Sequence, residues 1–379
     1  MKKKVLFIMP EMPGGGAEKV LLDIFRMFDY GRYDVTLLLE FHEGVYINDI
    51  PDSVNVISIH KKNSIWRQRL HRFLVLFCMY SFVHRLVCGI YVHYLLSGIT
   101  YDAIVSFMEG RAVKIHSYIM GKAPRNLSWI HIDFKKKHWS LEFYKDKCEE
   151  FRCYSRMDEI ICVSNDVRSH FLELYPIDGQ KCKVLYNLIN VKEITRCAQL
   201  GEKRRTDEKI QICMVGRLNH QKRYDRAIEV ARLLKDSGYN FELFIYGEGE
   251  LNDEIQRMIS DYGLENYVAL KGFVKPPYAC MASADIFLIT SESEGLPLVI
   301  CEAFCIGLPV VSTRTSGAIE LLDESKYGIL VEEDVDAIYK GVKHLIDNEL
   351  LRDYYAKRSK ERSILFSPDK TIREIYALL

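Results

Sequence analysis

Two glutamates eight residues apart, with a glycine and a proline between them, form the most informative stretch of this sequence. Glu294 lies shortly after an apolar run at 286–289 that predicts a buried strand, and Pro297 suits the first position of a helix that Gly307 would end. Amide groups at a helix start lack intrahelical partners and favour an anion such as phosphate. Carboxylates at Glu294 and Glu302 can accept hydrogen bonds from hydroxyl groups. The stretch fits either a sugar-nucleotide site or an ordinary strand–helix turn with two solvated glutamates.

The same stretch resembles a known family motif. Glu294-Gly295-Leu296-Pro297 followed by Glu302 is similar to the E-x7-E motif of glycosyltransferase family 4, and GLPVV at 307–311 matches that family's usual next strand. The resemblance extends over nearly the whole chain. It implies an α/β protein with the GT-B fold, two Rossmann-like domains facing across a cleft, and a retaining transferase that uses sugar nucleotides without a metal. It implies that the donor is bound by Glu294, Gly295, Leu296, Pro297, Leu298 and Glu302, with Glu294 on the sugar and Glu302 on the ribose.

A loop after the strand predicted at 211–215 carries two cations. Gly216, Arg217 and Lys222 lie on it, and an arginine and a lysine on a glycine-started loop suit a diphosphate. A capped turn with surface bases is the alternative. The resemblance assigns Gly216, Arg217 and Lys222 to the donor diphosphate, with both cations stabilising charge during transfer. Gly247, at the end of the next strand, is a further candidate donor contact because of its place in a strand–helix turn. The resemblance implies that Phe273 and Val274 hold the base through their backbone.

A glycine run follows the first strand, which is predicted at 5–9. Glycines 14–16 allow a phosphate or sugar to approach the backbone. A dinucleotide-binding fingerprint is the rival interpretation, and Glu40 does end the next apolar run, but the glycine spacing does not match. The resemblance implies that Gly15 and Gly16 lie opposite the donor diphosphate.

His131 lies near the carboxyl end of a strand predicted at 127–132, where α/β proteins bind ligands. A lone histidine there is commonly a satisfied loop residue, and a zinc site needs further ligands, none of which is evident. The resemblance implies that this histidine contacts the donor sugar beside the scissile bond, as part of the catalytic machinery. Asp334 and Asp336 form a D-x-D, for which we favour helix capping over metal binding. We therefore expect neither a metal nor another cofactor.

The composition is that of a globular protein. The chain has 379 residues, 48% of them hydrophobic and 27% charged, and its formal net charge is zero. This length suits two domains, which we place at 1–190 and 191–365, with a helix at 366–379 returning to the first. Zero net charge points to no nucleic-acid partner. The 11 scattered cysteines fit a reducing cytoplasm, and the apolar run at 5–9 is too short for a signal peptide.

Residues 53–101 contain no Asp or Glu, but they contain six Lys or Arg and four His among many large apolar side chains. No uncharged stretch reaches the ~20 residues that a membrane span needs. The segment 61–85 predicts reversible binding to an anionic membrane surface, or else helices packed on the first domain with a chance charge bias. Membrane binding would place the protein on the inner face of the cell membrane. The basic residues are Lys61, Lys62, Arg67, Arg69, Arg72 and Arg85.

These features predict an enzyme of the hexosyltransferase type. A hexose or N-acetylhexosamine would pass from a nucleotide diphosphate sugar, with uridine favoured over guanosine, to a saccharide acceptor on a lipid, during cell-surface polysaccharide synthesis. A GT-B epimerase or phosphorylase is an alternative, although no cofactor lysine for a phosphorylase can be identified. A non-catalytic module that binds sugar nucleotides is another.

Overall fold

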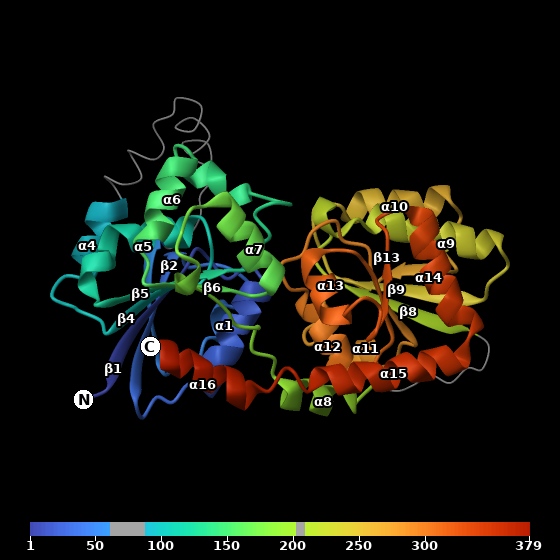
Figure 1. The fold of residues 1–379 in the computed structure, drawn as a ribbon. Helices are drawn as coiled ribbons and strands as arrows, with labels where there is room; N and C mark the ends of the chain where they lie inside the picture. The colour runs from blue at the N-terminus through green and yellow to red at the C-terminus, as the bar shows by residue number, and fades with distance from the viewer. Residues whose placement is uncertain (61–87, 202–208) are drawn as a thin grey trace. The chain divides into compact units, whose positions relative to one another are not determined.

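The computed structural model describes residues 1–60, 88–201 and 209–379, which form two compact units (Figure 1). Unit 1 comprises Met1–Leu188 and Asp369–Leu379, and unit 2 comprises Ile189–Pro368. The sequence placed these divisions at about 190 and 366. The predicted membrane-binding segment, 61–85, lies outside the described residues.

Unit 1 is built on a seven-stranded sheet in which all paired neighbours are parallel. The apolar run from Val5 to Met9 is buried, as expected of a parallel strand that is covered on both faces. The strands are β1 (Lys3–Met9), β2 (Tyr33–Phe41), β3 (Val54–His60), β4 (Ala103–Ser106), β5 (Arg125–Ile130), β6 (Glu159–Cys162) and β7 (Cys182–Val184). Their order is β3-β2-β1-β4-β5-β6-β7, so the strand order reverses between β1 and β4. Ligands of such sheets bind beyond the carboxyl ends of the strands at this reversal.

The C-terminal helix packs on unit 1, as Figure 1 shows beside the first helix. The Tyr376 ring stacks on Tyr33 with 5.1 Å between ring centroids, and its hydroxyl donates to the Met27 carbonyl at 3.2 Å. Arg125 Nε donates to the Leu378 carbonyl at 3.0 Å. The α-helices of unit 1 are α1 (Gly16–Met27), α4 (Ile90–Leu95), α5 (Arg111–Ile119), α6 (Lys147–Ser155), α7 (Asn165–Leu174) and α16 (Pro368–Leu378).

Unit 2 is a second parallel sheet, of six strands in the order β10-β9-β8-β11-β12-β13. The strands are β8 (Ile210–Val215), β9 (Phe241–Tyr246), β10 (Val268–Leu270), β11 (Ile286–Ile289), β12 (Val310–Thr313) and β13 (Ile329–Val331). Figure 1 shows helices on both faces of this sheet. The α-helices are α8 (Val191–Ala198), α9 (Tyr224–Asp236), α10 (Asn252–Asp261), α11 (Tyr278–Ala282), α12 (Leu298–Ile306), α13 (Ser316–Leu322), α14 (Val335–Asp347) and α15 (Glu349–Ser363). The order reverses between β8 and β11, so ligands are expected at the carboxyl ends of these two strands.

Two local predictions differ from the structure. β5 ends at Ile130, so His131 follows the strand instead of lying in it. Pro297 precedes α12 as its N-cap, with φ −70° and ψ 102°. The proline ring fixes φ at a value that suits both a helix and an extended residue, so the sequence could not distinguish these positions. Within the described ranges, no helix is both long enough and apolar enough to cross a membrane.

Candidate active site

The E-G-L-P segment of unit 2 forms the turn between β11 and α12, and the next strand–helix turn supports it. Thr313 Oγ1 donates to the Ser291 carbonyl at 2.6 Å, and the Gly317 N–H donates to the Glu294 carbonyl at 3.2 Å. A Cβ added at Gly317 would lie 2.6 Å from the Gly295 carbonyl oxygen, so a larger residue would displace the turn. The backbone that carries Glu294 is therefore fixed by β12 and by the start of α13.

The second loop, 216–223, joins β8 to α9. Asn219 Oδ1 accepts a hydrogen bond from the Lys222 N–H at 3.2 Å, and the Tyr224 hydroxyl donates to the Gly216 carbonyl at 3.0 Å. These bonds hold both ends of the loop. The Arg217 side chain is exposed and makes no hydrogen bond or ion pair with any other described residue. Arg217 is thus available to a ligand, whereas the backbone at Lys222 is fixed.

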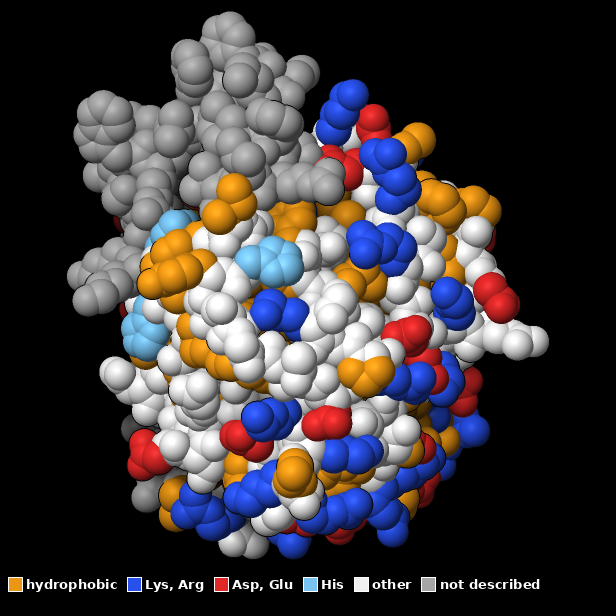
Figure 2. Space-filling model, turned by 90° about the vertical axis from the view of Figure 1, so that its left-hand side faces the viewer, with side chains coloured by type: hydrophobic (Ala, Val, Ile, Leu, Met, Phe, Trp, Pro, Cys, Tyr) orange, Lys and Arg blue, Asp and Glu red, His pale blue; other side chains and the backbone are white. Residues whose placement is uncertain are grey.

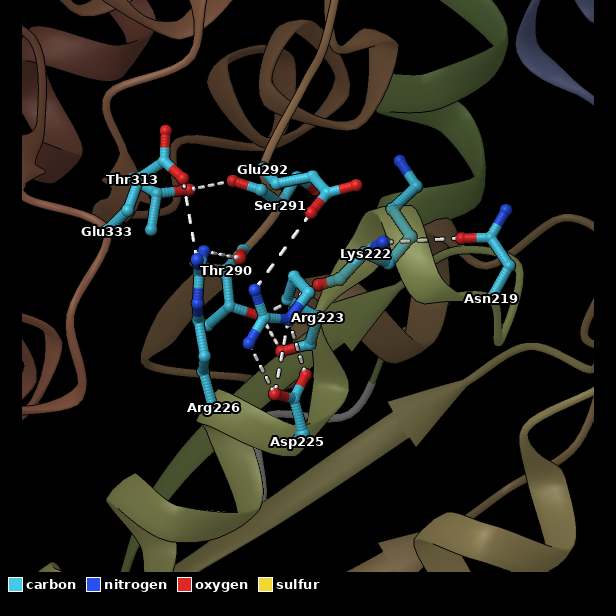
Figure 3. A network of polar contacts seen from close by, with 10 residues as sticks. All are labelled: Asn219, Lys222, Arg223, Asp225, Arg226, Thr290, Ser291, Glu292, Thr313 and Glu333. Atoms are coloured by element: carbon cyan, nitrogen blue, oxygen red, sulfur yellow. Dashed lines mark hydrogen bonds and ion pairs between the residues drawn. The ribbon is translucent and has the colours of Figure 1, made fainter. Parts of the chain in front are cut away.

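Hydrogen bonds join the two loops, and Figure 3 shows part of this network. Thr290 Oγ1 donates to the Lys222 carbonyl at 2.9 Å. Gln221 Nε2 donates to the Ser293 carbonyl at 2.7 Å, and the Gln221 carbonyl accepts from the Glu292 N–H at 3.0 Å. Sequence reasoning missed the roles of Thr290 and Gln221, since neither residue type is diagnostic at these positions. The turns after β8 and β11 consequently act as one platform at the reversal of the strand order.

This platform brings two predicted donor residues into direct contact. Lys222 Nζ lies 2.6 Å from Glu294 Oε1, and the two side chains are 21% and 11% exposed. Glu302 is buried in α12 and accepts a hydrogen bond from the Tyr278 hydroxyl at 3.2 Å. The two glutamates are therefore not solvated, in contrast to the alternative interpretation, whereas their contacts with a donor stay a prediction. Tyr278 carried no sequence signal, because a tyrosine after two prolines has many explanations.

The turns after β9 and β10 lie next to the platform. Gly247 has φ 151°, and a Cβ there would lie 1.8 Å from the Gly216 carbonyl oxygen, so close approach requires glycine at this position. Phe273 is 44% exposed, and its N–H points at the Glu248 carboxylate from 3.5 Å. Val274 follows it, half-buried. Recognition of a base by the backbone here stays a prediction.

His131, in unit 1, is placed by a buried carboxylate. The backbone N–H of His131 donates to Glu109 Oε2 at 3.1 Å, and the centroids of the His131 and Phe107 rings are 5.1 Å apart. Burial lowers the pKa of His131 to about 4, against the opposing effect of a hydrogen bond to the Phe107 backbone. The buried Nε2 has no hydrogen-bond partner among the described residues. At neutral pH the imidazole is uncharged, and its contact with the donor sugar stays a prediction.

Glu109 itself follows β4, at the reversal of the strand order in unit 1. It is 1% exposed, and burial raises its pKa to about 7, with the carboxylates of Glu18 and Glu150 adding to the shift. Sequence reasoning did not assign this residue to the site. A charged residue shortly after a buried strand, followed by glycine, was the available signal.

The chain after His131 is held by two further buried carboxylates. Asp133 Oδ1 accepts from His170 Nδ1 and from the Lys135 N–H, each at 2.9 Å. Glu150 is fully buried and accepts from the side chains of His138, Ser140 and Tyr175 at 2.6, 2.7 and 2.6 Å. This segment is therefore fixed by α6 and α7.

The glycine loop before α1 contains an unexpected carboxylate. A Cβ added at Gly15 would lie 2.4 Å from Glu18 Oε2, so the buried Glu18 side chain occupies the space over this glycine. Gly16 is exposed. The predicted approach of a diphosphate to Gly15 and Gly16 stays a prediction, and at Gly15 it requires Glu18 to move.

Comparison with known proteins identifies the family. The profile of glycosyl transferases group 1 matches residues 198–362, and that of Glycosyltransferase Family 4 matches residues 14–193. This chain belongs to glycosyltransferase family 4. The two matches divide close to the boundary between the units of the structure.

Two curated relatives of this family-4 chain are bacterial glycosyltransferases by name. The chain is 32% identical over 226 residues to N-acetylgalactosamine-N,N'-diacetylbacillosaminyl-diphospho-undecaprenol 4-alpha-N-acetylgalactosaminyltransferase of Campylobacter jejuni, covering 58% of this chain and 60% of that protein. It is 32% identical over 154 residues to poly(ribitol-phosphate) alpha-N-acetylglucosaminyltransferase of Staphylococcus aureus, covering 40% and 31%. The matches thus span about a third to three fifths of these relatives.

Solved structures show that the fold is GT-B. The crystal structure of Anabaena HepE in complex with UDP and glucose matches with a TM-score of 0.75 at 18% identity, covering 99% of this chain and 98% of that one. TarM matches with a TM-score of 0.78 at 15% identity, covering 100% and 99%. The predicted fold, with two Rossmann-like domains, is confirmed.

The two aspartates of the D-x-D, Asp334 and Asp336, make contacts at the start of α14. Asp334 is the N-cap of α14 and accepts from the Ala337 N–H at 2.8 Å, while Asp336 pairs with Lys340 at 2.5 Å. The capping interpretation is therefore confirmed. In the part of the chain that the structure describes, no group of three or more His, Cys, Asp or Glu could hold a metal ion. Activity without a metal stays a prediction.

Proposed function

We propose that this protein is a retaining glycosyltransferase that moves a hexose or N-acetylhexosamine from a nucleotide diphosphate sugar to a saccharide acceptor. The donor is a uridine diphosphate sugar in preference to a guanosine diphosphate sugar. The acceptor is carried on a lipid and belongs to cell-surface polysaccharide synthesis. Family membership, the activities named for the curated relatives and the complexes of HepE with UDP support this assignment.

The observation that carries the proposal is the arrangement of charges at one edge of unit 2. The Arg217 side chain has no partner among the residues that the structure describes, Lys222 and Glu294 lie together, and α12 starts next to Glu294. Cations and the positive end of a helix suit a diphosphate, and the carboxylate suits sugar hydroxyls. The first turn of α12 contains no acidic residue that would oppose an anion at the helix start.

In the proposed reaction, the acceptor hydroxyl attacks the anomeric carbon from the face that the diphosphate leaves. The C–O bond to the diphosphate breaks with its electron pair, and a phosphate oxygen takes the proton of the attacking hydroxyl. Arg217, Lys222 and the start of α12 stabilise the charge that develops on the leaving group. Glu294 orients the sugar and Glu302 the ribose, while neutral His131 accepts a hydrogen bond from the sugar.

We also propose attachment to an anionic membrane at the cytoplasmic leaflet. The basic residues that suggest it lie outside the described ranges, but α4 adds support. Ile90, Tyr91 and Tyr94 are exposed by 63%, 41% and 74%, and Figure 2 shows hydrophobic side chains and histidines together on this face of unit 1. The test is co-sedimentation with anionic liposomes at low and high salt. Three proteins are compared: the wild type, the double variant I90S/Y94S, and a variant with Gln at Lys61, Lys62, Arg67, Arg69 and Arg72. Equal binding by all three proteins, or none by the wild type, would contradict attachment.

The test of the function is turnover of purified protein with a panel of UDP and GDP sugars, with and without membrane lipid extracts. We expect one UDP sugar to be consumed slowly by hydrolysis alone and much faster with an acceptor. Glu294→Ala should abolish both reactions. A protein that binds donors but never releases the nucleotide would instead be a binding module, and an isomeric sugar nucleotide as product would indicate an epimerase.

A further inference from the structure

The ion pair between Lys222 and Glu294 joins two groups that the donor would also use. We propose that Glu294, acting through Lys222, determines the preference of this site for the intact sugar donor over the nucleoside diphosphate that remains after transfer. This inference rests on the proposed function. In this inference, the Glu294 carboxylate and a phosphate of the ligand compete for the ammonium group of Lys222.

The pair is held by its surroundings and largely shielded from water. Nζ and Oε1 are 2.6 Å apart, and the side chains are 21% and 11% exposed. The Lys222 backbone is fixed from both sides, by Asn219 at its N–H and by Thr290 at its carbonyl. The Glu294 carbonyl is fixed by the Gly317 N–H. Both side chains therefore start from anchored backbones that face each other across the platform.

Binding of a bare nucleoside diphosphate disturbs this pair without replacing it. The phosphates draw Lys222 away, bring further negative charge, and leave the mostly buried Glu294 carboxylate without its cation. An ionised group that loses its partner in a shielded position is costly. Free UDP therefore gains less from Lys222 than the distance between charges alone would suggest.

An intact donor supplies new partners for both Lys222 and Glu294. The sugar hydroxyls donate hydrogen bonds to Glu294 while the diphosphate takes Lys222, so both groups have partners in the bound state. After transfer the sugar leaves with the acceptor, and Glu294 competes for Lys222 again. The arrangement favours binding of substrate and release of product. Arg217, whose side chain has no partner in the described part of the chain, gives up no such pair when either ligand binds.

The chain offers a matched control for the test. Glu292 lies on the same loop, with its side chain 41% exposed and its carboxylate 4.0 Å from Arg223. Glu292→Gln removes the same charge as Glu294→Gln without touching Lys222. Calorimetric titration with UDP is expected to show about tenfold tighter binding to Glu294→Gln than to the wild type, equivalent to about 1.4 kcal/mol, and a change of less than about twofold for Glu292→Gln. A loss of folding cannot produce a gain in affinity.

A double variant tests whether the gain in UDP affinity comes from the loss of the ion pair between Lys222 and Glu294. In Lys222→Met, the further change Glu294→Gln should tighten UDP binding by less than about threefold, because the competing pair no longer exists. In steady-state assays, Glu294→Gln should lower the inhibition constant for UDP while raising KM for the donor. The ratio of these two constants is the preference that we assign to the pair.

Three outcomes would overturn the inference. Glu294→Gln could bind UDP no more tightly than Glu292→Gln, or the gain could be as large in the Lys222→Met background. In either case, UDP binding by the wild type would leave the proposed donor class intact. If the wild type bound neither UDP nor GDP in the same titration, the donor class and the inference would both be wrong.

Discussion

The edges at which the two sheets reverse their strand order differ in electrostatics. In unit 2, cations and carboxylates lie in partly exposed pairs on loops that hydrogen bonds join, as at Lys222 and Glu294. In unit 1, the corresponding edge holds Glu109 and His131, buried groups whose pKa values shift toward their neutral forms. The edge of unit 2 therefore carries charged side chains, which suit a charged ligand. The edge of unit 1 carries buried side chains whose neutral forms can hydrogen-bond with hydroxyl groups.

The comparison explains which parts of the site were readable from the sequence. Arg217, Lys222, Glu294 and Gly295 stand in short motifs in which residue type and spacing already imply a ligand. Glu109 depends on a contact with His131, 22 positions later, that only the folded sheet creates. Apolar runs predicted strands such as β1, β8 and β11, because parallel strands are buried on both faces. The ion pair itself was not predicted, since both partners had been assigned separately to the donor.

The largest expected effect follows from removing Arg217. Arg217→Ala should weaken UDP binding about 100-fold, since a charge-assisted hydrogen bond contributes about 1.5–3 kcal/mol. Lys222→Ala should weaken it less, because the cost of breaking the pair with Glu294 offsets part of its contribution. Calorimetric titration measures both, with Arg232→Ala on the exposed side of α9 as the control. A smaller loss for Arg217→Ala than for Lys222→Ala would reverse the roles that the structure gives them.

The next effect tests the buried edge of unit 1. The pKa of Glu109 is raised to about 7 by burial, so its charged form costs stability in the folded state. That cost is absent at low pH, grows as the pH rises from the ordinary carboxyl value, and is complete above pH ~7. Glu109→Gln keeps an acceptor for the His131 N–H and should be more stable than the wild type by about 2 kcal/mol at pH ~8, but not at pH ~4. Thermal unfolding at the two pH values measures this, and a pH-independent difference would show that Glu109 is not buried in its charged form.

A smaller effect is expected at His131. His131→Phe keeps a buried ring but removes the open Nε2, and should lower kcat/KM about tenfold, as the loss of one neutral hydrogen bond predicts. Because burial lowers the pKa of His131 to about 4, its ring stays neutral from pH ~6 to ~9 and gives the activity no titration in that range. A rate profile in which the wild type alone loses activity near pH ~6.5 would show that the imidazole is charged in part of its working range.

The smallest effect concerns the D-x-D. Asp334→Ala should destabilise unit 2 by about 1 kcal/mol through loss of the cap on α14, whereas Asp336→Ala should change stability by less than about 0.5 kcal/mol. Neither change should affect transfer, and EDTA should leave the wild-type activity unaltered. Loss of activity in EDTA that manganese or magnesium restores would assign these aspartates to a metal.

The most direct test of the central claim is proton NMR of the first sugar transferred from a UDP donor to its acceptor, recorded during turnover. We predict that the nucleoside diphosphate is released as the new glycosidic bond forms and that the anomeric proton keeps the coupling of the donor's configuration. Inverted configuration in the first-formed product, or no consumption of any nucleotide sugar in the presence of acceptor, would contradict a retaining glycosyltransferase with its donor site on unit 2.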